Sequence, residues 1–146
     1  MSNLIVKFLI PPDDSIADAM YVRTKVFQEE QGIDKKLDFD GNDDSSTHIL
    51  IYDGKNPIGT GRIRKIDDET VKIERVAVLS EMRSHGVGKL IMKSINDYLS
   101  KTKVMRITLD AQLHAKGFYE GLGYKHEGEI FEEVGIPHVV MVKIFD

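Results

Sequence analysis

The sequence reads Arg83-Ser84-His85-Gly86-Val87-Gly88-Lys89 at the junction between a strand-like run, residues 71–79, and an amphipathic helical segment that ends near Leu99. Two glycines one residue apart, flanked by Arg83 and Lys89, allow a loop whose backbone N–H groups turn inward. The start of the helix adds unpaired N–H donors and the positive end of the helix dipole. A phosphate or pyrophosphate fits such a loop, so the stretch predicts a site for a nucleotide-bearing cofactor.

Two well-known phosphate-binding motifs fail on individual residues of this stretch. The dinucleotide-binding fingerprint requires a third glycine where Ile91 stands. The Walker motif requires a glycine where Arg83 stands and a serine or threonine where Leu90 stands. A tight turn between a strand and a helix, with no ligand, stays as the alternative.

The composition narrows the class of protein. With 146 residues, 41% hydrophobic and 30% charged, the chain is expected to form one domain, residues 1–146. The formal net charge of −4 disfavours nucleic acid as a main partner. The absence of cysteine excludes disulfides and cysteine nucleophiles and fits a cytoplasmic location. No apolar stretch approaches the roughly 20 residues of a membrane span, and no secretory signal is visible, so we expect no membrane partner.

Hydrophobic periodicity and turn signals predict an α/β (α+β) fold with the order β-α-β-β-β-α-β-α-β-β. The unit from residue 71 to residue 110 should be a right-handed strand–helix–strand crossover with parallel strands. The other strand pairs are expected to be antiparallel, which makes the sheet mixed. Strands are expected at residues 4–10, 47–52, 58–66, 70–79, 104–110, 124–131 and 138–145, and helices at about 16–31, 87–99 and 113–122.

Three motifs follow one another in an order typical of a known family. They are Glu74-Arg75-Val76-Ala77-Val78, the pattern Arg-x-x-Gly-x-Gly at residues 83–88, and Ala111-Gln112-Leu113-His114-Ala115-Lys116-Gly117-Phe118-Tyr119. Together they resemble the GNAT superfamily of acetyl-CoA-dependent N-acetyltransferases. Residues 26–31 and 128–138 resemble its ElaA-like or YjcF-like branch. The resemblance covers the whole chain and implies a twisted, mostly antiparallel mixed sheet with helices on both faces.

The resemblance implies acetyl-CoA as a co-substrate and no metal. In the family, the strand matching Val76, Ala77 and Val78 binds the pantetheine arm, and one backbone N–H faces the thioester carbonyl, where negative charge develops. The loop that holds the CoA pyrophosphate would comprise Arg83, Ser84, His85, Gly86, Val87, Gly88 and Lys89. Two residues of the next segment, Gln112 and Phe118, are further expected cofactor contacts.

The resemblance also implies a proton donor for the leaving group. Tyr119 matches the tyrosine that lies near the sulfur in many family members, and its hydroxyl would protonate the departing thiolate. An aromatic residue at an interface, with a hydrated hydroxyl, is the alternative for Tyr119. Acyl transfer to a primary amine of a small molecule or peptide would proceed by direct attack in a ternary complex, because no cysteine is present to carry the acyl group. A non-catalytic acyl-CoA-binding or sensing module on the same fold is the alternative function.

The general base is open among three residues. Glu74 stands two residues before Val76, on the same strand face if the strand has no bulge. Its alternatives are a solvated strand residue or an ion-pair partner of Arg75 or Lys72. Glu132 and His138, in the last hairpin, are rival bases and candidate acceptor-binding residues.

The remaining polar clusters predict neither a metal site nor a defined assembly. Four acidic residues resemble a calcium loop only superficially, because Ile49 or Ile51 stands where the closing glutamate is required. The segment is therefore expected to be a solvated loop, and the histidines show no metal-ligand spacing. A homodimer is compatible with the sequence, which does not set the oligomeric state. The four acidic residues are Asp38, Asp40, Asp43 and Asp44.

Overall fold

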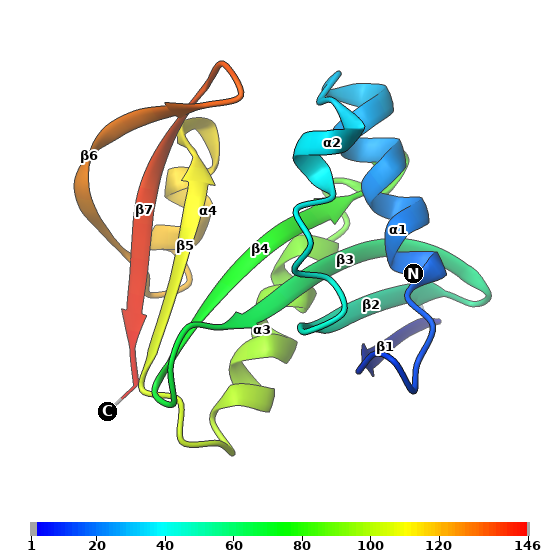
Figure 1. The fold of residues 1–146 in the computed structure, drawn as a ribbon, viewed down its shortest axis with the longest axis horizontal. Helices are drawn as coiled ribbons and strands as arrows, with labels where there is room; N and C mark the ends of the chain where they lie inside the picture. Colours follow the sequence, from blue (N-terminus) through cyan, green and yellow to red (C-terminus); the bar gives the residue numbers. More distant parts are fainter. Residues whose placement is uncertain (1–2, 146) are drawn as a thin grey trace.

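The computed structural model describes residues 3–145, which form a seven-stranded sheet with helices on both faces (Figure 1). The strands lie in the spatial order β1-β2-β3-β4-β5-β7-β6. Within the described residues β4–β5 is a parallel pair and the other five pairs are antiparallel, so the expected mixed sheet is confirmed. The strands are β1 (Leu4–Leu9), β2 (Thr47–Asp53), β3 (Asn56–Lys65), β4 (Thr70–Val78), β5 (Arg106–Gln112), β6 (Lys125–Glu133) and β7 (Ile136–Ile144).

The helices follow the predicted order, and two short helical turns, at residues 35–38 and 80–82, lie outside the three helices that were expected. The helix expected at residues 16–31 is present, but its second half is π-helical, and a separate one-turn helix follows it. No helix within residues 3–145 is long and apolar enough to cross a membrane. The helical elements are α1 (Ala17–Arg23), η1 (Thr24–Glu30), α2 (Lys35–Asp38), η2 (Ser80–Met82), α3 (Val87–Leu99), η3 (Leu113–Ala115) and α4 (Lys116–Glu120).

Two helical layers enclose the strands β2, β3 and β4. In Figure 1, α1 and α2 lie in front of the sheet and α3 lies behind it. Helix α3 is amphipathic, because its apolar residues recur at helical spacing on the face that packs against the sheet. The buried residues of α3 are Val87, Ile91, Met92, Ile95 and Leu99, and they pack in the same core as the buried residues of β2–β5.

The acidic segment between α2 and β2 is not the solvated loop that we expected. Asp38 and Asp43 bind the Arg23 guanidinium of α1 at 3.0 and 2.6 Å. Arg62 of β3 binds Asp40 and Asp43 at 2.7 and 3.0 Å, and the Arg23 and Arg62 side chains are 1% and 0% exposed. Charges that lose their water are stable only when paired. This arginine–aspartate cluster therefore ties the segment to α1 and β3.

Strands β4 and β5 pair along only part of their length. The parallel register ends at Ile73 opposite Leu109, although β4 continues to Val78 and β5 continues to Gln112. Beyond the last pair the strands diverge, and Figure 1 shows the opening between them at the end next to α2 and the β6–β7 turn. The opening leaves one edge of β4 without a strand partner.

Candidate active site

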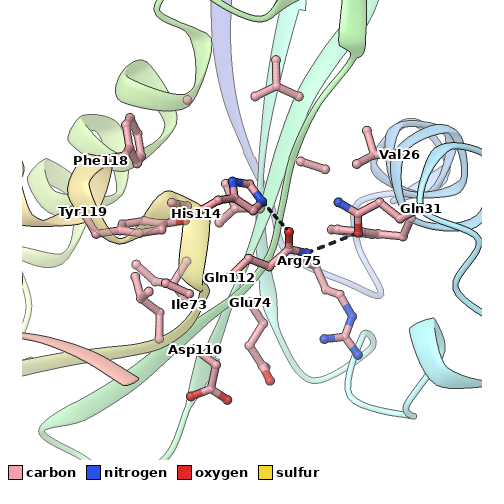
Figure 2. A pocket seen from close by; sticks show the side chains of 18 of the residues that line it. Val26, Gln31, Ile73, Glu74, Arg75, Asp110, Gln112, His114, Phe118 and Tyr119 are labelled. Atoms are coloured by element: carbon pink, nitrogen blue, oxygen red, sulfur yellow. Dashed lines mark hydrogen bonds between the residues drawn. The ribbon is translucent and has the colours of Figure 1, made fainter. Parts of the chain in front are cut away.

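A cavity of about 710 Å³ occupies the opening between β4 and β5. Its walls come from the diverging strand ends, the 83–89 loop, η1, α4 and the β6–β7 turn. Figure 2 shows side chains from different elements around this space, with Gln31 of the η1 end on one side and Gln112 of β5 and Tyr119 of α4 on the other. Segments far apart in the sequence thus contribute to one cleft.

The unpaired edge of β4 presents backbone groups to this cavity. The Leu79 N–H donates to the Ile58 carbonyl at 3.0 Å, on the side of β3. Since backbone groups of successive strand residues point to alternate edges, the N–H and C=O of Val78 point away from β3. The Val78 carbonyl accepts from Arg83 at 3.0 Å on that edge. The Val78 N–H, and by the same alternation that of Val76, face the opening.

The glycine loop leads into α3 through backbone conformations that suit an anion. Ser84 and Gly86 have φ values of 66° and 79°, and Gly86 is the N-cap of α3. The first N–H groups of the helix, from Val87 onward, have no partners within the helix. A β-carbon on Gly88 would lie 3.5 Å from the Phe118 ring, so the glycine leaves space between the loop and α4. The loop therefore has the donors and the room for a phosphate.

Arg83 is already engaged with protein groups. Its guanidinium donates to the Glu30 carboxylate of η1, with one contact of 2.6 Å, and to the Val78 carbonyl. The hydrogen bond from Arg83 lowers the pKa of Glu30, against a smaller opposing effect of burial. Arg83 thus joins three elements at the cavity rim, and the exposed side chain of Lys89 carries positive charge on the same loop.

Tyr119, on α4, lines the cavity, where its hydroxyl can act as a proton donor. Its side chain is 8% exposed, and its ring packs edge-on against Phe118 and Tyr124 at 5.1 and 5.8 Å between centroids. No group within residues 3–145 hydrogen-bonds to its hydroxyl. Burial raises the pKa of Tyr119 to about 12, so the phenol keeps its proton at neutral pH.

Glu74 has a different setting from the one expected. The β3–β4 register shifts between Thr60 and Arg62, and Arg75 adopts φ 55°, so β4 is bulged there. Glu74 binds Arg62, whereas Val76 lies 3.6 Å from where a β-carbon of Gly61 would stand. Because Gly61 and Arg62 are consecutive, they face opposite sides of the sheet. The shared face of Glu74 and Val76 was expected only for a strand without a bulge, and the bulge removes that condition.

Ion pairs also hold the Glu74 carboxyl group in its charged form. Its carboxylate accepts from Arg64 at 2.7 Å and from Arg62 at 2.9 Å. Burial by itself would raise the pKa of Glu74, but the hydrogen bonds and charges of the two arginines outweigh it and lower the pKa. Of the two expected partners, Lys72 is present at 4.0 Å from the carboxylate, whereas the closer partners Arg62 and Arg64 were not predicted. A carboxylate held in this way is a weak proton acceptor.

The comparisons with known proteins agree with this architecture. A sequence profile described as "Acetyltransferase (GNAT) domain" matches residues 16–145. The chain belongs to the GNAT acetyltransferase family. Its relatives include the uncharacterized N-acetyltransferase YjcF of Bacillus subtilis (strain 168), which is 39% identical over 132 residues, 90% of this chain and 94% of YjcF. ElaA of Escherichia coli (strain K12) is 33% identical over 129 residues, 85% of this chain and 84% of ElaA.

Solved structures place this GNAT chain near the same branch. The crystal structure of Escherichia coli ElaA superposes with a TM-score of 0.82 and 30% identity, over 96% of this chain and 99% of ElaA. A GNAT family acetyltransferase from Elizabethkingia anophelis with acetyl-CoA bound shares the fold, with a TM-score of 0.71 and 15% identity, over 99% of this chain and 100% of that protein. The expected ElaA-like or YjcF-like branch is confirmed. Family membership makes the chain an N-acyltransferase with an acyl-CoA donor and does not favour a sensing module.

The cavity of this GNAT chain brings most of the predicted site residues together. Two of them, His85 and Glu132, do not line it. The sequence reasoning did not single out Gln31, Lys72, Arg75 or Asp110 as cavity residues, although all of them line it. The predicted residues in the lining are Glu74, Val76, Ala77, Val78, Arg83, Ser84, Gly86, Val87, Gly88, Lys89, Gln112, Phe118, Tyr119 and His138.

Proposed function

We propose that this chain, as one domain, transfers an acetyl group from acetyl-CoA to a primary amine by direct attack in a ternary complex. The observation that carries the proposal is the unpaired edge of β4 between the glycine loop and Tyr119 in one cavity. Two ligands enter such a cleft from opposite faces of the sheet, so that the amine meets the thioester between the strands. No cysteine is present to carry an acyl intermediate.

The cofactor half of the proposal rests on backbone groups. The loop at Ser84 and Gly86 and the first turn of α3 supply N–H donors to a diphosphate, and Lys89 supplies positive charge. The N–H and C=O groups of Val76 and Val78 act as an edge to which the pantetheine amides add like a strand. An N–H on this edge also stabilises the negative charge that develops on the thioester oxygen.

The chemical half of the proposal assigns the leaving group to Tyr119. As the C–S bond breaks, the sulfur gains negative charge, and the Tyr119 hydroxyl donates a hydrogen bond to it. Because its pKa is raised to about 12, the phenol gives up its proton only as that charge develops. His138, on the β7 side of the cavity, forms part of the proposed acceptor wall, and Glu132 stands at the outer end of the same hairpin.

Calorimetry and a melting assay with acetyl-CoA test the proposal. Binding to the folded state raises the melting temperature once the ligand exceeds its dissociation constant, and NAD and ATP are expected to do less. A panel of primary amines, with release of free CoA thiol as the readout, then identifies the acceptor class. No heat of binding and no shift in melting temperature with acetyl-CoA would reject the proposal.

A further inference from the structure

Three polar side chains form a hydrogen-bonded row across the cavity. Gln112, at the end of β5, donates from Nε2 to Oε1 of Gln31 at 3.3 Å. Nε2 of His114, in η3, lies 2.8 Å from Oε1 of the same Gln112 amide. Figure 2 shows the row with its two dashed contacts, running from His114 to Gln31. The row therefore joins the β5 arm to the end of η1 inside the proposed acyl-transfer site.

The direction of this row determines which nitrogen of His114 carries the proton. Because the Gln112 amide nitrogen donates to Gln31, the amide oxygen faces His114 and accepts a hydrogen bond there. The imidazole donor is thus Nε2–H. A neutral imidazole has a single N–H, so Nδ1 keeps a lone pair. No group within residues 3–145 hydrogen-bonds to that Nδ1, and His114 lines the cavity.

Four of the five carboxylates that line the cavity are ion-paired with arginine or lysine, and the fifth, Glu133, is more than half exposed on the β6–β7 hairpin. Glu74 is held by Arg62 and Arg64, and Asp110 binds Lys72 at 2.9 Å. The two arginines lower the pKa of Glu74, so this carboxylate has little tendency to accept a further proton.

His138, the second histidine that lines the cavity, is fixed by its hairpin. Its Nδ1 contacts the Ile136 carbonyl at 2.7 Å, and its ring stacks on Phe131 with 5.8 Å between centroids. Its Nε2 lies 4.0 Å from the Glu133 carboxylate, and only 7% of the residue is exposed. His114 is exposed, so it can return a proton to solvent after each turnover.

We propose that His114 is the general base of this site, with Nδ1 as the atom that accepts the amine proton, and that Gln112 and Gln31 are positioning residues. The inference rests on the proposed acetyl transfer. The amine nitrogen forms a bond to the acetyl carbon, and the C–S bond breaks with its electron pair going to sulfur. One amine proton moves to Nδ1 of His114, and the thiolate takes a proton from Tyr119. Both side chains then regain their starting state by exchange with water, which leaves the amide and free CoA.

The first test is the rate of acetyl transfer as a function of pH. His114→Gln keeps an N–H donor toward Gln112 but replaces the basic ring nitrogen by an amide group that does not take up a proton, and we expect kcat to fall about 10²- to 10⁴-fold. The fall of the wild-type rate on acidification should disappear, and added imidazole should partly restore the rate of His114→Ala. The matched control is His126→Gln on β6, where the ring contacts a main-chain carbonyl outside the cavity, and its rate should not change. A His114→Gln enzyme with the wild-type rate and pH profile overturns the proposal.

The second test concerns the positioning residues. Gln112→Glu keeps an acceptor for Nε2–H, and the Gln31 amide can turn to donate to the new carboxylate. We expect kcat of Gln112→Leu to fall about tenfold and Gln112→Glu to recover a large part of that loss, because only the glutamate accepts from Nε2–H of His114. Equal rates in the two variants would remove Gln112 from its positioning role.

The third test needs no acceptor. Nitrogen-15 NMR of the imidazole rings at neutral pH should show His114 as the Nε2–H tautomer with an unprotonated Nδ1. A protonated Nδ1 in the neutral ring overturns the proposal whatever the acceptor is. Calorimetry with acetyl-CoA separates the proposed acetyl transfer from the proposed role of His114. A wild-type protein that does not bind acetyl-CoA refutes the acetyl transfer. Normal binding together with a protonated Nδ1 refutes only the role of His114.

Discussion

The two edges of strand β4 differ in what they bind. Along the β3 edge the strand is paired from Val71 to Val78, with one bulge, and charged side chains next to that edge are neutralised by arginines. Along the β5 edge pairing ends at Ile73, and the remaining backbone faces a cavity. The comparison teaches that one strand supplies stability along its β3 edge and a binding surface along its β5 edge. We call the β3 edge, with the strands and ion pairs next to it, the closed side, and the β5 edge with its cavity the open side.

The buried arginine cluster explains how the closed side holds its shape. Arg62 binds Asp40, Asp43 and Glu74 and is fully buried, so it joins β3, β4 and the acidic segment. Asp38, a member of this cluster, and the adjacent Leu37 line the cavity from the α2 side. The closed side therefore positions one wall of the open side.

Removing the central arginine should give the largest effect on the closed side. Arg62→Ala leaves three carboxylates without their shared partner, and we expect a loss of about 3–5 kcal/mol in the free energy of unfolding. Urea denaturation measures it. The matched control is Arg106→Ala, which breaks an exposed pair with Glu127 and should cost about 0–1 kcal/mol. Equal losses in the two variants would contradict a structural role for the cluster.

Removing the hydroxyl of the proposed proton donor should affect the open side alone. Tyr119→Phe is expected to lower kcat about 10²-fold or more while acetyl-CoA affinity and the melting temperature stay close to those of the wild type. Steady-state kinetics and calorimetry measure the two quantities. Tyr124→Phe is the control, because Tyr124 is buried against Tyr119 but does not line the cavity. A Tyr119→Phe enzyme with full kcat and an unchanged pH profile would remove the residue from catalysis.

Filling the gap between the glycine loop and α4 should weaken cofactor binding more modestly. Gly88→Val places methyl groups next to the Phe118 ring, where a β-carbon alone would already lie at 3.5 Å. We expect acetyl-CoA affinity to fall about tenfold, which corresponds to about 1.4 kcal/mol.

Calorimetry on two further variants sharpens the prediction for Gly88. Phe118→Ala in the Gly88→Val background should recover part of the affinity, because the two side chains compete for the same space. Gly117→Val, where a β-carbon meets open space, is the control. Unchanged affinity in Gly88→Val would show that the loop does not approach the cofactor.

Acid should destabilise the closed side gradually, and this is the smallest expected effect near neutral pH. Burial lowers the pKa of His48 from 6.5, so below pH 6.5 the unfolded chain takes up a proton there that the folded state resists, and stability falls. The pKa of Glu74 is lowered from 4.5, so its contribution is complete above pH 4.5 and is lost as the pH falls further. The melting temperature between pH 8 and pH 3 measures both stages. His48→Gln should remove the first stage alone, and a melting temperature that rises on acidification would contradict the assignment.

The order of elements was predictable because periodicity and turn chemistry are local properties. The apolar run in residues 47–52, bounded by the Asp53-Gly54 turn, and the helical spacing in residues 87–99 match β2 and α3 to within a residue or two. The bulge at Arg75 was not predictable from the local sequence. Its φ of 55° goes together with the shift in the β3–β4 register, and that register depends on a strand distant in the sequence. For the same reason the sequence did not decide whether Glu74 shares a face with Val76.

The parts of the cavity that local sequence motifs form were predictable. The parts that depend on side chains from distant elements were less predictable. The glycine loop, the β4 edge and Tyr119 follow from motifs that lie within about 50 residues of one another. The partners of the acidic segment did not follow, since Arg23 and Arg62 come from other elements. A signal was available, because Arg23 lies on the predicted apolar face of its helix, where a charged residue is normally paired.

Amide hydrogen exchange along β4, with and without acetyl-CoA, tests most directly whether the unpaired edge binds the cofactor. The N–H groups of Val76 and Val78 should exchange fast in the free protein and slow at least tenfold on binding. The Ala77 N–H, which faces β3, should be protected in both states. Slowing of Val76 and Val78 with Ala77 unchanged is the predicted result. Tight binding of acetyl-CoA that leaves the exchange of Val76 and Val78 unchanged would contradict it.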